Sequence, residues 1–218
     1  MSPPANHFTY LRDRIALMNK ESLKALAQLD PRMGELIARV GPIHHEPRRL
    51  PTFRALAQAI VHQQLSGKAA GTILSRFQAL YPSRTFPEPE DVVATPMEVL
   101  RSVGLSRPKS SYMLDLASRA VAGKIPSTEQ CDTMTDGDLI HLLTEIKGIG
   151  AWTVEMMLIF NLGRPDVLPI HDLGVQNGYQ KAYGKRQRPT SEQLARAGRK
   201  WSPHRTLATL YLWRAVDL

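Results

Sequence analysis

The sequence predicts an all-α protein that is built from a series of short helices. Apolar residues recur at helical spacing in one stretch after another, and no stretch alternates apolar and polar residues for long enough to indicate a strand. Asp, Ser, Thr and Pro precede these stretches and Gly follows several of them, as is typical of helix ends. With 218 residues, of which 43% are hydrophobic, the chain can form one compact unit or two small lobes that share a cleft.

The first helix signal lies at Asp30 and Pro31. An aspartate followed by a proline is typical of an N-cap and a first helical turn, and the apolar residues that follow fall on one face up to Val40. The next apolar stretch begins at Phe53 and runs to Val61. Both stretches keep the period of about 3.6 residues that predicts an amphipathic helix.

Two glutamines interrupt the second of these stretches. Gln63 and Gln64 fit either an exposed turn or the edge of a cleft that contacts a ligand, because buried amides need hydrogen-bond partners. Ser66 then predicts the N-cap of another helix, which buries residues up to Phe77.

The remaining helices follow from their caps and apolar faces. Thr135 and Asp138 are spaced like a capping box, although the acid is one carbon shorter than usual. Residues 81–90 are rich in proline and indicate a linker between helices. Helices are predicted at residues 95–104, 113–123, 135–146, 173–182 and 201–213.

Composition narrows the classes of function. Lys and Arg number 28 against 20 Asp and Glu, and the net charge of +8 favours a polyanionic partner, nucleic acid first and a membrane surface second. The single cysteine, Cys131, excludes an internal disulfide and a four-cysteine zinc or iron–sulfur site. The histidines show no metal-ligand spacing. The start, MSPPANHFTY, has no apolar signal core and no apolar run is long enough to cross a bilayer, so we expect a soluble cytoplasmic protein.

A tight turn between two helices is the first candidate for function. Gly148, Ile149 and Gly150 allow the backbone to turn sharply and another surface to approach closely. The amide groups at the start of the second helix are unpaired, and a helix N-terminus carries roughly half a positive charge, so a phosphate fits there. A plain corner without a ligand remains the alternative. If the turn binds nucleic acid, the contacts are expected from Lys147, Gly148, Gly150, Ala151 and Thr153.

Carbonyl groups in the same turn can bind a cation. A monovalent ion such as Na⁺ or K⁺ would touch the phosphate as well as the carbonyl oxygens of Thr144, Ile146 and Ile149. We expect no required cofactor, no zinc and no iron–sulfur cluster.

An isolated acid follows the turn by 22 residues, from Gly150 to Asp172 (172 minus 150). Asp172 follows Pro169 and precedes a predicted helix, so an ordinary N-cap worth about 1 kcal/mol is one interpretation. A catalytic carboxylate is the other. The two roles are compatible, because a capping carboxylate is held rigidly.

The hairpin and this acid together carry a family resemblance. LTEIKGIGAWTVEMMLIF followed by LPIHDLGV resembles the helix-hairpin-helix and catalytic segment of the HhH-GPD superfamily of DNA base-excision glycosylases. FRALAQAIVHQQLSGKAAGTILSRF and LRSVGLSRPKSSYMLDLA resemble the alkylation-repair branch, 3-methyladenine DNA glycosylase II. The resemblance covers residues 53–218 and places the superfamily's catalytic aspartate at Asp172. Trp152 stands where backbone-cutting members carry a lysine, so no lyase step is expected. We also expect no β domain of the kind that precedes some relatives.

The resemblance implies a two-lobed fold with a cleft between helical subdomains. Residues 53–163 would form the central subdomain with the hairpin, while residues 1–52 and 164–218 would form the second subdomain with the Asp172 loop. The cleft would hold Asp172 and Trp152. The implied partner is double-stranded DNA with alkylated bases, bound by a monomer.

The implied activity is hydrolysis of the N-glycosidic bond of 3-methyladenine or 7-methylguanine during base excision repair. The sugar becomes oxocarbenium-like in the transition state, and a fixed carboxylate lowers its energy and orients the attacking water. An alkylated purine is already cationic and leaves without an acid, so one carboxylate suffices.

The damaged base must leave the stack and enter a pocket. Trp152 is the first candidate for an aromatic wall, and a core role is its alternative; Gln63, Gln64 and His204 are further candidates for substrate binding. Trp201, Tyr211 and Trp213 rank lower, because they also fit a C-terminal core helix. Leu105 or Arg107 is expected to fill the space that the base leaves, and Lys109 to hold a phosphate, although a basic loop without these roles fits equally.

Two alternatives remain open. The first is a glycosylase for another lesion, such as a deaminated or oxidised base. The second is a DNA-binding module that uses the hairpin without catalysis.

Overall fold

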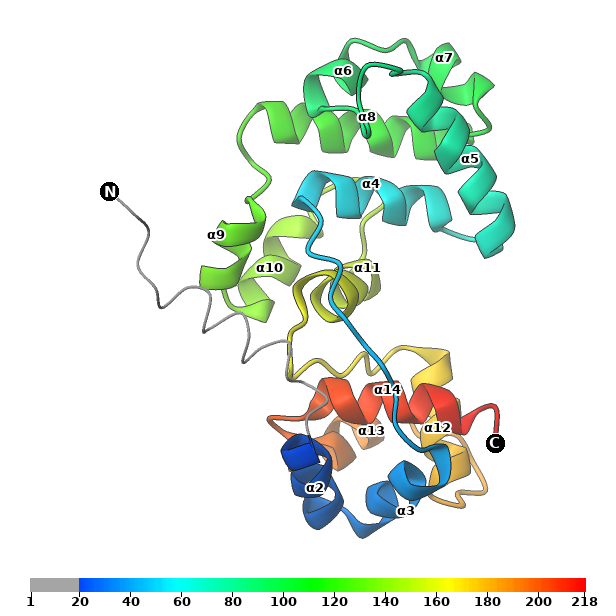
Figure 1. Cartoon of the computed structure of the whole chain (residues 1–218), viewed down its shortest axis with the longest axis vertical. Coiled ribbons are helices and arrows are strands. Elements are labelled where there is room, and N and C mark those ends of the chain that lie inside the picture. Colours follow the sequence, from blue (N-terminus) through cyan, green and yellow to red (C-terminus); the bar gives the residue numbers. More distant parts are fainter. Residues whose placement is uncertain (1–19) are drawn as a thin grey trace. The chain divides into compact units, whose positions relative to one another are not determined.

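The computed structural model describes residues 20–218, and all regular elements in this range are helices (Figure 1). The predicted all-α class is therefore confirmed. The chain divides into two compact units. Residues 49–157 form one, which we call the central unit, and residues 20–48 together with residues 158–218 form the other, the terminal unit. By these contacts the central unit spans residues 49–157, while the resemblance implied residues 53–163 for it.

The central unit is a bundle of short helices around α8. This helix packs against α4, α6 and α7, and Figure 1 shows it lying beside α4 and α6. Its core consists of fully buried side chains such as Leu56, Phe77, Met113 and Leu143. The elements are α4 (Thr52–His62), α5 (Gly67–Ala79), α6 (Pro89–Val93), α7 (Met97–Ser102), α8 (Arg107–Val121), α9 (Thr128–Thr133), α10 (Asp136–Leu143) and α11 (Ala151–Met157).

Side-chain caps start several of these helices where the sequence places them. Ser66 Oγ accepts a hydrogen bond from Ala69 N at 3.4 Å, and Thr135 Oγ1 accepts one from Asp138 N at 3.1 Å. The predicted capping box at Thr135 differs in one bond. The Asp138 carboxylate accepts from the Thr135 hydroxyl at 2.7 Å, whereas a full box would have it accept from the Thr135 backbone N–H.

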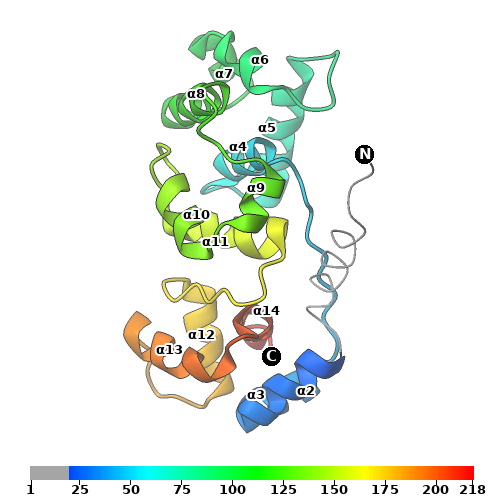
Figure 2. The ribbon, with the colours of Figure 1, turned by 90° about the vertical axis from the view of Figure 1, so that its left-hand side faces the viewer.

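The terminal unit is organised around the C-terminal helix α14. This helix packs against α12 and α3, and α2 packs against α3 (Figure 2). Trp201 was expected within the last helix, but it lies in a separate 3₁₀ turn that ends before α14 begins. The elements are α2 (Lys20–Leu29), α3 (Pro31–Val40), the π-helical η2 (Leu158–Leu162), α12 (Leu173–Ala182), α13 (Ser191–Gly198), η3 (Arg199–Trp201) and α14 (Arg205–Ala215).

A buried carboxylate joins three parts of the terminal unit. Asp30 is 1% exposed and caps α3 through Arg32 N, as the sequence predicts. Its Oδ2 also accepts hydrogen bonds from Tyr183 and from Trp201 Nε1 at 2.8 Å, and it forms an ion pair with Lys200 at 2.9 Å. Burial raises the pKa of Asp30, but the hydrogen bonds from Tyr183, Trp201 and Lys200 outweigh burial and hold the pKa below its ordinary value.

No helix within residues 20–218 is both long enough and apolar enough to span a bilayer.

The Asp30 network predicts a pH-dependent contribution to stability. A carboxylate with a lowered folded pKa stabilises the fold fully above its unfolded pKa of about 3.9, and this contribution is lost as the pH falls through the folded value. We expect Asp30→Asn to lower the free energy of unfolding by about 2 kcal/mol at pH 7, because it removes a charged acceptor of buried donors. The difference from the wild type should shrink at pH 3, as measured by urea unfolding.

Glu35→Gln provides the control for this prediction. Glu35 pairs with Arg32 in the same unit, but both side chains are more than 60% exposed, so its loss should cost less than about 0.5 kcal/mol. An equal effect of both substitutions would contradict the assigned role of Asp30.

Candidate functional site

Asp172 is held by two hydrogen bonds that converge on one of its oxygens. It is the N-cap of α12, and its Oδ1 accepts from Val175 N at 2.8 Å and from Trp213 Nε1 at 2.9 Å. The predicted cap and the predicted helix, residues 173–182, are both observed. The bond from the indole was not predicted, and it fixes the carboxylate to α14 as well as to its own helix.

Two glycines of α12 allow α14 to come this close. A Cβ on Gly174 would lie 2.9 Å from Trp213 Cδ1 and 3.1 Å from Asp172 Oδ1. A Cβ on Gly178 would lie 1.9 Å from the carbonyl oxygen of Leu212, which belongs to the backbone and cannot turn away. The two helices are therefore in backbone contact, and this contact places Trp213 beside Asp172.

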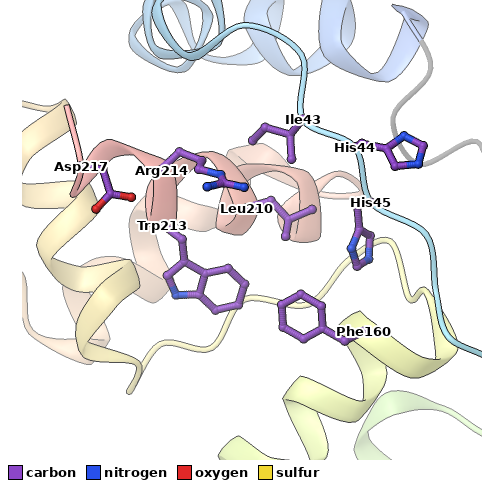
Figure 3. Close-up of a pocket in the computed structure, with 8 residues that line it drawn as sticks. All are labelled: Ile43, His44, His45, Phe160, Leu210, Trp213, Arg214 and Asp217. Atoms are coloured by element: carbon purple, nitrogen blue, oxygen red, sulfur yellow. The ribbon is translucent and has the colours of Figure 1, made fainter. Parts of the chain in front are cut away.

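Trp213 also forms one wall of a pocket (Figure 3). Its indole stacks on the Phe160 ring with centroids 5.7 Å apart and planes at 16°, and Phe160 comes from η2. The pocket has a volume of ≈ 250 Å³. Its lining consists of Ile43, His44, His45, Phe160, Leu210, Trp213, Arg214 and Asp217. Trp213 therefore connects the two features, because the same indole donates to the Asp172 carboxylate and lines the pocket.

The segment before α4 also lines this pocket, through Ile43, His44 and His45. His45 lies edge-on to the Phe160 ring with centroids 5.4 Å apart, and its Nε2 donates to Ile159 O at 3.1 Å. Arg48 N donates to Phe160 O at 2.9 Å, so the segment is fastened to η2 at two points. Burial lowers the pKa of His45, more than the hydrogen bond to Ile159 raises it, which favours the neutral imidazole.

The loop between η2 and Asp172 is fixed by the start of α14. Asp166 Oδ1 accepts from Arg205 N at 3.1 Å and from Arg205 Nε at 2.8 Å, and Ser202 donates to its Oδ2. Burial raises the pKa of Asp166, but the bonds from Arg205 and Ser202 lower it below its ordinary value. Asp166 is therefore an ion-pair partner of Arg205 that holds the loop leading to Asp172.

The hairpin between α10 and α11 uses its two glycines for different purposes. Gly148 has φ +78°, and a Cβ there would lie 2.1 Å from the Tyr112 ring of α8. Gly150 has no neighbouring atom within 4 Å of the position of a Cβ. Gly148 is therefore needed for packing inside the central unit, while Gly150 leaves the backbone open to a partner from outside.

The candidate contact residues of the hairpin differ in exposure. Lys147, Gly148, Gly150 and Ala151 are exposed. Trp152 is 49% exposed, whereas Thr153 is only 7% exposed, so its side chain packs inside the unit. Only the backbone of Thr153 is placed to serve the predicted contact.

The predicted cation would use carbonyls of the same turn. The carbonyl of Ile146 already accepts a hydrogen bond from Ile149 N at 3.0 Å, and the carbonyls of Thr144 and Ile149 belong to the same turn. The cation stays a prediction. Within residues 20–218, no group of three or more His, Cys, Asp or Glu side chains is placed to hold a metal ion.

The loop that was expected to fill the space left by the flipped base is only partly on the surface. Leu105 is 3% exposed, and it follows Gly104, which has φ +106°. It packs inside the central unit in this conformation, so Arg107, the exposed first residue of α8, remains the candidate from this loop. Lys109 was expected to hold a phosphate, but its Nζ donates to Val61 O at 2.9 Å and to Gln63 O at 2.6 Å.

The other predicted substrate contacts lie in different places. Gln63 Nε2 donates to Gly148 O at 2.7 Å, and Gln64 is exposed with φ +56°. His204 is the N-cap of α14, nine residues before Trp213, and it is not among the residues that line the pocket. Trp201 and Tyr211 are buried in the core of the terminal unit, so of the lower-ranked aromatic residues only Trp213 reaches the pocket.

Comparison with known proteins places this geometry in a family. The model of the HhH-GPD superfamily of base excision DNA repair proteins matches residues 57–204, which is more than half of the chain and includes both the hairpin and Asp172. The chain belongs to the HhH-GPD superfamily. The resemblance inferred from the motifs is thereby confirmed.

Several similar proteins carry the name of a 3-methyladenine DNA glycosylase or glycosidase. DNA-3-methyladenine glycosylase 1 of Schizosaccharomyces pombe is 36% identical over 197 residues, which cover 88% of this chain and 86% of that protein. The structure of S. pombe 3-methyladenine DNA glycosylase (Mag1) in complex with abasic DNA has a TM-score of 0.80 at 34% identity and covers 91% of this chain and 98% of that one. The DNA-3-methyladenine glycosidase of Bacillus halodurans has a TM-score of 0.83 at 33% identity and covers 91% and 90%.

The contact between α12 and α14 predicts that Gly178 tolerates no side chain. Gly178→Ala forces the two backbones apart, so we expect the free energy of unfolding to fall by about 1–3 kcal/mol, as for other overpacked sites. Urea unfolding measures the change.

Gly71→Ala is the matched control. Gly71 is also inside a helix, but nothing lies within 4 Å of its Cβ position. Alanine should there stabilise the helix by up to about 1 kcal/mol. A similar response of both glycines would contradict the inferred contact.

Proposed function

We propose that this chain is a monofunctional DNA glycosylase that hydrolyses the N-glycosidic bond of alkylated bases in double-stranded DNA during base excision repair. 3-Methyladenine and 7-methylguanine are the proposed substrates. The observation that carries this proposal is the Asp172 carboxylate, fixed by Val175 N and Trp213 Nε1, beside an aromatic pocket that Trp213 lines. Membership of the HhH-GPD superfamily and similarity to 3-methyladenine glycosylases support it.

Asp172 stabilises the reacting sugar. Breaking the bond between C1′ and the base leaves positive charge on the sugar, and a carboxylate that is already in place stabilises this charge without reorganising. The same carboxylate orients the water that attacks C1′ and accepts its proton. The two donors on Oδ1 keep the carboxylate from rotating away during the reaction.

The pocket accepts the flipped base. At ≈ 250 Å³ it is smaller than the pockets of about 300–1,000 Å³ that hold drug-sized ligands, which suits a single base. A cationic purine gains about 0.5–2 kcal/mol against an electron-rich ring, and Phe160 and Trp213 offer such rings. A neutral His45 adds no positive charge that would repel the base.

The hairpin holds the DNA backbone. Exposed Lys147, Gly150 and Ala151 offer a charge and backbone amides to a phosphate without reading a base. The net charge of +8 favours binding to duplex DNA, and a monomer suffices for it. Trp152 offers an aromatic surface at the same hairpin. Because Trp152 is not a lysine, no Schiff base forms there and the abasic strand stays intact.

Incubation with methylated duplex DNA tests the activity directly. We expect release of 3-methyladenine and 7-methylguanine, seen by chromatography of the freed bases, and an abasic strand that breaks only after treatment with alkali. Asp172→Asn should abolish release while DNA binding is retained, because asparagine is as good an N-cap as aspartate but carries no charge.

The two alternatives give different results in the same experiment. Release of uncharged oxidised guanine but not of 3-methyladenine would assign another lesion class. DNA binding without any base release would leave a non-catalytic hairpin module. Release at an unchanged rate by Asp172→Asn would remove Asp172 from the mechanism.

Trp213→Phe tests the bond that fixes Asp172. Phenylalanine keeps a ring to stack on Phe160 but removes the N–H donor. A hydrogen bond to a charged group is worth about 1.5–3 kcal/mol, so we expect single-turnover excision to slow by roughly 10- to 100-fold while the affinity for undamaged DNA stays the same. Tyr81→Phe, which removes a hydroxyl that bonds Thr95 in the central unit, is the control and should excise at the wild-type rate.

A further inference from the structure

Lys109 bonds two carbonyl groups of another segment of the central unit. Its Nζ donates to the carbonyls of Val61 and Gln63, which lie at the C-terminal end of α4. The last carbonyls of a helix have no partner within the helix, and a cation at this end also complements the helix dipole. Lys109 itself is in the first turn of α8. It therefore joins the start of α8 to the turn between α4 and α5.

The same α4–α5 turn is tied to the hairpin. The side chain of Gln63 donates to Gly148 O at 2.7 Å, while Gly148 packs against Tyr112, which belongs to α8 as Lys109 does. Gln64, the next residue, has φ +56°, a left-handed conformation that is unfavourable for a residue with a side chain. A turn that holds this conformation needs support from its surroundings.

We propose that Lys109 and Gln63 are positioning residues that hold the α4–α5 turn and the hairpin together as one DNA-binding surface. This inference rests on the proposed function, in which the hairpin binds DNA. The turn from His62 to Gly67 is mostly exposed beside it, so both segments are available to the same strand.

The contacts of Lys109 distinguish this role from a phosphate contact. Two of its three donors are used by carbonyls of its own unit. Arg107, two residues earlier, is exposed and has no such bonds among the described residues. Burial also lowers the pKa of Lys109, as expected for an ammonium group that serves the interior rather than the solvent.

The first test compares salt dependence with excision rate. Log K for DNA binding falls as log salt concentration rises. Removing a lysine that contacts a phosphate makes this slope less steep by about 1. We expect Lys109→Met to leave this slope for undamaged duplex unchanged and to slow single-turnover excision of 3-methyladenine by roughly 10-fold, because the loss misplaces the turn. Lys109→Arg, which keeps donors for both carbonyls, should recover most of the rate.

Two further variants sharpen the test. Gln63→Leu should slow excision to a similar extent, and the double variant should lose less than the product of the two single losses, because both residues belong to one network. Lys124→Met, which removes an exposed lysine after α8, should behave as the wild type. A lower salt slope, or excision at the wild-type rate in Lys109→Met, would overturn the proposal.

Hydrogen exchange tests the coupling without any use of activity. We expect Lys109→Met to speed amide exchange in the α4–α5 turn and also in the hairpin, whereas Lys124→Met should change neither segment. Faster exchange in the turn alone would show that the two segments are not coupled. If the wild type released no alkylated base, the proposed function would fail, while this measurement would still decide whether the network exists.

Discussion

The hydrogen bond between Asp172 and Trp213 is the contact on which the candidate active site depends. It joins the first residue before α12 to the last turns of α14, and it exists because Gly174 and Gly178 let the two helices touch. The same indole lines the pocket, so the distance from carboxylate to pocket is set by the packing of two helices rather than by a flexible loop. A site built in this way is already organised before a ligand arrives.

The two units support their candidate surfaces in the same physical manner. In the terminal unit, Arg205 and Asp166 fix the loop that leads to the carboxylate. In the central unit, Lys109 and Gln63 fix the turn beside the hairpin. In each case, polar side chains from elsewhere in the unit bond carboxylate or backbone groups of a loop or turn. Rigid support of this kind is what precise positioning of a reacting group requires.

Local features of the site could be predicted from the sequence, and long-range ones could not. The N-cap at Asp172 and the helix after it depend on a few neighbouring residues, and the structure has both as expected. Nothing in the spacing connects residue 213 with residue 172, because that contact arises only when two helices pack. Leu105 and Lys109 show the same limit. The sequence predicts a basic, exposed loop around them. In the structure, Leu105 is buried, and Lys109 donates to a carbonyl of α4.

Net charge alone does not identify the residues that meet DNA. Arg205 pairs with Asp166, Lys200 with Asp30 and Arg49 with Asp132, so these charges serve the fold and cancel in the total. The excess of +8 must come from other basic residues, and exposed ones such as Lys147 remain available to phosphates. Salt dependence counts only charges that displace counterions from DNA. A basic residue near a candidate interface carries the same positive charge whether it contacts DNA or stabilises the fold. Its contacts in the structure therefore have to decide between these two roles.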